Sequence, residues 1–121
     1  MDNKPPGSGG DKKLNHKIGS SVNYIQKQLS QKLTVEGLAE RVFLSTDYFS
    51  KTFMEIMEIR PIDFINNKRL ERAQLLLTTT DKPLQDIAEK VGIPNLSYFS
   101  RMFKRKFGIP PAKFRIQKWG V

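Results

Sequence analysis

Hydrophobic residues recur every three or four positions along most of this chain, which is the spacing of one face of an α-helix. Between residues 14 and 29 they are Leu14, Ile18, Val22, Ile25 and Leu29. The same spacing returns in residues 35–42 and 84–91. No stretch of any length alternates hydrophobic with polar residues as a half-buried β-strand does. The pattern therefore predicts an all-α fold of about seven helices.

Two parts of the chain, about fifty residues apart, repeat the same order of residues. "LAERVFL" (38–44) matches "IAEKVGI" (87–93), and "YFSKTF" (48–53) matches "YFSRMF" (98–103). Two copies are too few for a solenoid, so the repeat indicates a duplicated supersecondary unit. The ten identical pairs are Ala39/Ala88, Glu40/Glu89, Val42/Val91, Tyr48/Tyr98, Phe49/Phe99, Ser50/Ser100, Phe53/Phe103, Ile59/Ile109, Pro61/Pro111 and Phe64/Phe114.

Each copy carries the boundary signals of two helices around a tight turn. Thr34 can cap the first short helix, and Pro83 can begin its counterpart. Ser45 and Asn95 are suitable N-caps for the longer helix that follows each turn. A short helix, a turn and a longer helix make a helix-turn-helix unit, so the sequence predicts two of these units.

The domain organisation follows from these boundaries. Residues 1–13 consist largely of proline, glycine and charged residues, and we expect them to form a disordered linker or tail. Residues 14–60 should form the first helix-turn-helix unit with a leading helix. Residues 61–80 should form a long linker helix that acts as a rigid spacer, and residues 81–121 the second unit with a closing helix.

The long helix of the second copy has two chemically different faces. At about 100° per residue, Phe99 and Phe103 fall on one side, whereas Ser97, Ser100 and Arg101 fall on the other. We expect the repeated aromatic residues to pack in the core rather than stack on single-stranded bases, which would require exposed rings. These residues are Tyr48, Phe49, Phe53, Tyr98, Phe99 and Phe103.

The formal net charge of +9 favours nucleic acid or an anionic membrane surface as the partner. Residues 34–64 carry three basic and six acidic side chains, a net charge of −3. Residues 82–121 carry nine basic and two acidic side chains, a net charge of +7. Phosphate contacts are therefore expected mainly from the second unit.

The composition argues against an enzyme. The chain has no cysteine, and His16 is its single histidine, so a thiolate nucleophile and a metal site are not expected. No paired carboxylates or glycine-rich phosphate loop appear. No apolar run approaches the roughly 20 residues that a membrane span needs. We expect no catalysis, no cofactor, no metal and no membrane partner.

The polar face of the second long helix suits contact with DNA. Small hydroxyls at Ser97 and Ser100 allow close approach, and Arg101 can donate two hydrogen bonds to guanine. Basic residues follow one turn later, where phosphates would lie. These predicted phosphate ligands are Lys104, Arg105 and Lys106. The alternative for this face is an ordinary solvated helix surface.

Three stretches together, "LAERVFLSTDYFSKTF", "RLERAQLLL" and "IAEKVGIPNLSYFSRMFKRKFGIPPAKFR", resemble the DNA-binding domain of AraC-type transcriptional regulators. The likeness covers about residues 22–118. It implies two homeodomain-like helix-turn-helix subdomains joined by a long helix, which enter successive major grooves of a bipartite promoter site. The base-contacting positions it implies are Thr46, Asp47, Ser50 and Lys51 in the first unit and Asn95, Leu96, Ser97, Ser100 and Arg101 in the second.

The first unit departs from the family pattern. Met54 stands where the second unit has Lys104, and Glu58 stands where it has Gly108. Asp47 could accept a hydrogen bond from a cytosine amino group or simply favour the positive end of its own helix. We therefore expect the second unit to supply most of the affinity for DNA.

The expected function is sequence-specific binding of double-stranded DNA in bacterial transcription regulation, in the cytoplasm and associated with the nucleoid. The resemblance implies the C-terminal DNA-binding domain of a larger sensor-regulator, with oligomerisation through an N-terminal domain and RNA polymerase as a second candidate partner. The alternative is a protein-interaction module on the same fold with weak or no specific DNA binding, which the acidic first unit favours. Activation or repression is left open.

Overall fold

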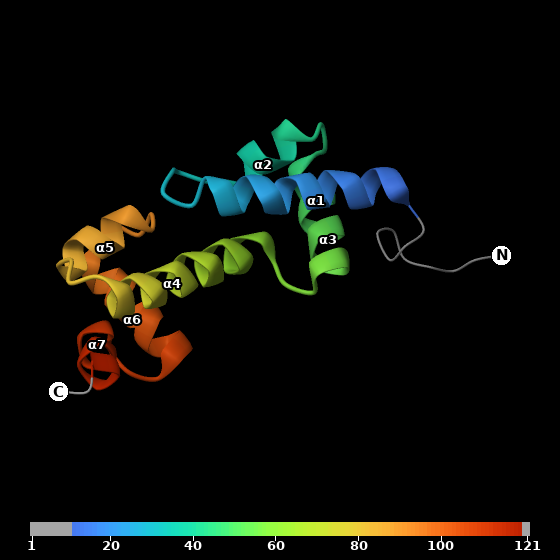
Figure 1. Ribbon diagram of the computed structural model, residues 1–121. Coiled ribbons are helices and arrows are strands. Elements are labelled where there is room, and N and C mark those ends of the chain that lie inside the picture. The colour runs from blue at the N-terminus through green and yellow to red at the C-terminus, as the bar shows by residue number, and fades with distance from the viewer. Residues whose placement is uncertain (1–10, 120–121) are drawn as a thin grey trace. The chain divides into compact units, whose positions relative to one another are not determined.

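The computed structural model describes residues 11–119, and these residues form seven α-helices without a β-strand (Figure 1). The predicted all-α fold is confirmed. In chain order the helices are α1 (Lys12–Lys27), α2 (Val35–Arg41), α3 (Thr46–Met57), α4 (Pro61–Thr79), α5 (Leu84–Lys90), α6 (Leu96–Phe107) and α7 (Pro111–Trp119). Within this described part of the chain, no helix has both the length and the apolar character that a bilayer span requires.

The first helix begins earlier than the sequence predicts. Asp11 caps α1, because its side-chain oxygen accepts a hydrogen bond from the backbone N–H of Leu14 at 3.1 Å. Lys12 and Lys13, which we expected in a disordered tail, are therefore helical. Residues 1–10 of that predicted tail lie outside the described residues.

Backbone contacts divide the chain into two compact units, with the division inside α4. The first unit runs to residue 65 but excludes residues 29–31, which belong with residues 66 onward in the second unit. The first five residues of α4 thus belong to one unit and the rest of this helix to the other. Its role as a rigid spacer stays a prediction.

The duplication extends from the sequence to the packing of the cores. In the first unit the ring of Phe53 meets Phe64 edge-on, with centroids 5.6 Å apart and an angle of 67°. In the second unit the equivalent rings of Phe103 and Phe114 are 5.5 Å apart at 71°. Each pair joins the long helix of a helix-turn-helix to the element that follows it. The two units therefore bury their aromatic side chains with the same packing geometry.

The prediction that all six repeated aromatic residues are buried is correct only for the phenylalanines. Phe49, Phe53, Phe99 and Phe103 have no exposed surface, whereas Tyr48 is 41% exposed and Tyr98 is 47% exposed. Each tyrosine lies about 100° around the helix from the phenylalanine that follows it. This places the tyrosines at the edge of the apolar face, where a phenol can keep its hydroxyl in water.

The turn between the two helices has the same hydrogen bonds in both units. The N–H of Leu44 donates to the carbonyl of Ala39 at 3.0 Å, and the N–H of Ile93 donates to the carbonyl of Ala88 at 2.9 Å. This bond, in which the donor lies five residues after the acceptor, defines a Schellman motif with a left-handed residue just before the donor. Phe43 fills that position in the first unit and Gly92 in the second, with φ of 61° and 88°.

Candidate nucleic-acid interface

Side-chain caps fix the start of both long helices, α3 and α6. The hydroxyl of Ser45 accepts a hydrogen bond from the N–H of Tyr48 at 3.2 Å. The side-chain oxygen of Asn95 accepts one from the N–H of Tyr98 at 2.9 Å. Each cap satisfies a backbone donor that would otherwise lack a partner, so the two predicted N-caps are confirmed. Each helix is twelve residues long.

The solvent-facing surface of α6 carries hydroxyl and basic groups. Ser97, Arg101, Lys104 and Arg105 are exposed, and Ser100 is half-buried. Among the described residues, no hydrogen bond or ion pair holds the guanidinium of Arg101. Its donors are available to an external acceptor. We call this set of five residues the polar face of α6.

Two of the predicted base-contacting residues also have structural roles. The side-chain oxygen of Asn95 accepts the N-cap hydrogen bond, and its side-chain NH2 group remains available to donate to another partner. Leu96 is half-buried and packs against the hydrophobic core of the second unit. Because Leu96 precedes Ser97 by one residue, it points about 100° away from it and toward the core.

Lys106 lies apart from the two other predicted phosphate ligands. Its Nζ is 3.9 Å from a carboxylate oxygen of Glu71 on α4 and 5.5 Å from the ring centroid of Phe107. Nine residues after Ser97, it falls about 180° from that serine around the helix. The structure therefore groups Lys104 and Arg105 with the polar face and places Lys106 on the opposite side of α6.

The corresponding surface of α3 is less basic and more apolar. Asp47 and Lys51 are exposed, and Thr46 and Ser50 are half-buried. Met54, at the position equivalent to Lys104, is 46% exposed. Asp47 lies in the first turn of α3, where a carboxylate is favoured by the positive end of the helix dipole. Glu55, at the position equivalent to Arg105, is half-buried. This surface of α3 thus presents one base, two acids and a thioether.

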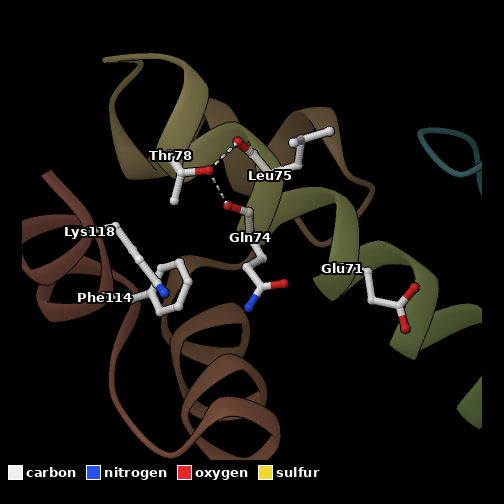
Figure 2. Close-up of a pocket in the computed structure, with 6 residues that line it drawn as sticks. All are labelled: Glu71, Gln74, Leu75, Thr78, Phe114 and Lys118. Atoms are coloured by element: carbon white, nitrogen blue, oxygen red, sulfur yellow. Dashed lines mark hydrogen bonds between the residues drawn. The ribbon is translucent and has the colours of Figure 1, made fainter.

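A pocket in the second unit lies between α4 and α7 and is shown in Figure 2. Two of its polar side chains already interact within the unit. The hydroxyl of Thr78 donates to the carbonyls of Gln74 and Leu75, at 3.3 and 3.0 Å. The ammonium of Lys118 lies 5.6 Å from the ring centroid of Phe114. The remaining lining residue is Glu71. Between residues 11 and 119 no cluster of histidine, aspartate or glutamate could hold a metal ion.

Two capped recognition helices, each following a Schellman turn and each with a polar outer face, define a double helix-turn-helix domain of the DNA-binding type. A family model described as a helix-turn-helix domain matches residues 38–117. Among solved structures, the C-terminal domain of AraT, a response regulator from Geobacillus stearothermophilus, is similar with a TM-score of 0.83 and 35% identity, covering 86% of this chain and 87% of that one.

Further relatives agree with this classification. The DNA-binding domain of AdpA, solved in complex with a target DNA, has a TM-score of 0.81 and 26% identity, covering 84% of this chain and 91% of that one. The bifunctional transcriptional activator/DNA repair enzyme AdaA of Bacillus subtilis is 40% identical over 94 residues, which make up 78% of this chain and 44% of that protein. The chain spans less than half the length of that curated relative.

The chain belongs to the AraC-type helix-turn-helix family of transcriptional regulators. The resemblance seen in the sequence is therefore confirmed, and so is the expected general function of DNA-binding transcription regulation.

Sequence reasoning missed two features of this surface. The half-exposed tyrosines Tyr48 and Tyr98 were expected in the core. The left-handed backbone of Phe43, whose ring is 89% exposed, was not predicted. The repeat itself held a signal for the second feature, because Phe43 aligns with a glycine in the other copy.

Proposed function

We propose that this chain binds double-stranded promoter DNA in a sequence-specific way, as the DNA-binding part of a larger bacterial regulator. The observation that carries the proposal is the polar face of α6, where an arginine without another polar partner in the described residues lies between small hydroxyls and further bases. In helix-turn-helix proteins the N-terminal part of the second helix meets the base edges in the major groove.

Arg101 is the principal base contact in this proposal. Its planar guanidinium can donate two hydrogen bonds to O6 and N7 of guanine, which is worth about 1–3 kcal/mol of discrimination. Ser97 and Ser100 lie on the same side of α6 and are small enough to let the helix approach the bases. Asn95 and Leu96, which the family pattern also implied, have the capping and core roles described above.

Phosphate contacts are assigned to Lys104 and Arg105. Both are exposed and lie one turn beyond Arg101, where the DNA backbone would pass. In the first unit, Asp47, Ser50 and Lys51 are the proposed base contacts, with Thr46 half-buried beside them. Because residues 82–121 hold nine bases against two acids, the second unit supplies most of the electrostatic affinity.

The wider assignments extend the proposal beyond the residues of this chain. Since this chain corresponds to 44% of one regulator and 35% of the arabinose operon regulatory protein of Escherichia coli, oligomerisation and signal sensing belong to a separate domain. RNA polymerase is the second proposed partner, and the bacterial nucleoid in the cytoplasm is the proposed site of action. No catalytic role is proposed, although one relative is named as an enzyme as well as an activator.

The proposal is tested by selecting binding sequences from a pool of random duplexes with the purified chain. We expect a non-palindromic consensus in two parts, bound in the presence of heparin as competitor. The second candidate function, a protein-interaction module, is favoured by the net charge of −3 over residues 34–64 and by the exposed ring of Phe43. If no sequence is enriched from the pool and heparin abolishes all binding to DNA, these results would support that candidate instead.

A further inference from the structure

The two tyrosines are the part of the repeat that neither the cores nor the proposed base contacts explain. Tyr48 and Tyr98 occupy equivalent positions in α3 and α6, and 41% and 47% of their surface is exposed. The next residue in each helix, Phe49 or Phe99, is completely buried. Because about half of each ring is exposed to solvent, core packing accounts for only part of its surface. The exposed part is available for another interaction.

In the second unit the ring of Tyr98 lies close to the guanidinium of Arg101. The guanidinium carbon of Arg101 lies 5.9 Å from the ring centroid, within the range of a cation–π interaction. Side chains on a helix tilt toward its N-terminus, so a residue at i+3 extends over the residue at i. The ring therefore meets an arginine that is directed toward the N-terminal end of α6, which is the end that enters a major groove.

The backbone at Tyr98 is well defined. Tyr98 is the third residue of α6, and its backbone N–H is held by the cap at Asn95, at 2.9 Å. The capped first turn thus fixes the backbone from which the ring projects, one turn before Arg101. An arginine side chain has much rotamer freedom, and a guanidinium held near a ring by a cation–π interaction keeps N–H groups free for an acceptor.

We propose that Tyr98 is a positioning residue for DNA recognition, which holds the guanidinium of Arg101 toward the N-terminal end of α6 and so sharpens discrimination at the base pair that Arg101 contacts. This inference rests on the proposed base contact of Arg101. In this proposal the aromatic ring of Tyr98, and not its hydroxyl, positions the guanidinium of Arg101. A hydroxyl that donates to a DNA phosphate is the competing role, and it would strengthen binding to every duplex alike.

The experiment uses the full chain and the duplex selected above. In a second set of duplexes the G·C pair that Arg101 contacts is replaced by another base pair. The measured quantity is the dissociation constant for the replaced duplex divided by that for the selected duplex. We expect Tyr98→Leu to lower this ratio by about three- to tenfold, the range of a cation–π contact that becomes partly desolvated. Tyr98→Phe keeps the ring and should stay within about twofold of the parent, since it preserves the contact.

Coupling between the two residues is measured with Arg101→Met. In that background Tyr98→Leu should leave the ratio unchanged, because the guanidinium is no longer present to be positioned. Tyr98→Gln serves as a second variant without a ring, and thermal melting of each variant is recorded to confirm that it is folded at the assay temperature. Agreement between the Leu and Gln variants would support the role of the ring.

Four results would overturn the inference. Equal losses for Tyr98→Phe and Tyr98→Leu would assign the role to the hydroxyl. A uniform loss of affinity on all duplexes, an unchanged ratio in Tyr98→Leu, or an undiminished effect of that change in the Arg101→Met background would remove the positioning role. If Arg101→Met alone leaves the ratio intact, the base contact of Arg101 fails as well, so the two failures are distinguishable.

Discussion

Phe43 and Gly92 occupy the same position of the same hydrogen-bonded turn, and both have a positive φ, of 61° and 88°. Glycine adopts this left-handed conformation freely, whereas for an L-residue with a Cβ it costs roughly 1–2 kcal/mol. The ring of Phe43 is 89% exposed, so burial in its own unit offsets little of that cost. The first unit therefore holds a bulky residue in a backbone conformation that the second unit assigns to glycine.

Replacing Phe43 by glycine should stabilise the first unit. Phe43→Gly removes the left-handed strain but increases the freedom of the unfolded chain, so we expect a net gain of about 0.5–1 kcal/mol in the free energy of unfolding. Thermal or urea unfolding measures it. A loss of stability would show that the ring makes contacts that outweigh the strain.

Replacing Gly92 should be costly for a second reason. A Cβ at this position would lie 2.3 Å from the carbonyl oxygen of Leu29 and 2.9 Å from Nε of Arg69. Arg69 is held in place, because it donates to the carbonyls of Leu29 and Gln31 at 3.0 and 2.7 Å. Burial lowers the pKa of its guanidinium. Gly92→Ala should therefore destabilise the second unit by more than the roughly 1–2 kcal/mol of strain alone.

Gly108 provides the matched control for this change. It has a similar φ of 89°, but a Cβ added there meets nothing within 4 Å. Gly108→Ala should cost only the strain, and urea unfolding of both variants compares the two. Equal losses would contradict the steric part of the argument.

A buried hydroxyl in the first unit should be dispensable. Thr52 has no exposed surface, and its Oγ1 finds no hydrogen-bond partner among the described residues. The equivalent position in α6 is Met102, which carries no hydroxyl. Because an unpaired buried hydroxyl costs about 1–3 kcal/mol, Thr52→Val should raise the free energy of unfolding by about 1 kcal/mol.

Ser21 is the comparison for Thr52. It is equally buried, but its hydroxyl donates to the carbonyl of Lys17 at 3.0 Å. Ser21→Ala removes a satisfied group and should give no comparable gain in thermal unfolding. If Thr52→Val destabilises the protein instead, its hydroxyl has a partner in solution.

Two lysines on α6 should differ in their effect on the salt dependence of DNA binding. Lys104 lies on the polar face, whereas Lys106 is 3.9 Å from the carboxylate of Glu71 on the other side of the helix. Each phosphate contact contributes about 0.9 to the slope of log K against log salt concentration. Lys104→Gln should flatten that slope by about this amount, and Lys106→Gln should leave it nearly unchanged. Equal changes in slope would contradict the separation of the two lysines.

What could be predicted from the sequence depends on signals that act over short distances. The all-α class and the N-caps at Ser45 and Asn95 follow from hydrophobic spacing and capping preferences, which involve residues only three or four apart. The duplicated unit follows from comparing two contiguous stretches of the sequence with each other. The family could be recognised for the same reason, because its motifs lie in contiguous stretches of the chain.

The sequence alone determined that this chain consists of two helix-turn-helix units with an apolar and a polar side to each long helix. The use of residues near the boundary between the two sides depends on long-range packing. This packing exposed the rings of Tyr48 and Tyr98, directed Leu96 into the core and paired Lys106 with Glu71. The physical reason is that exposure and pairing depend on which neighbouring helix covers a given edge, and that neighbour is distant in the sequence.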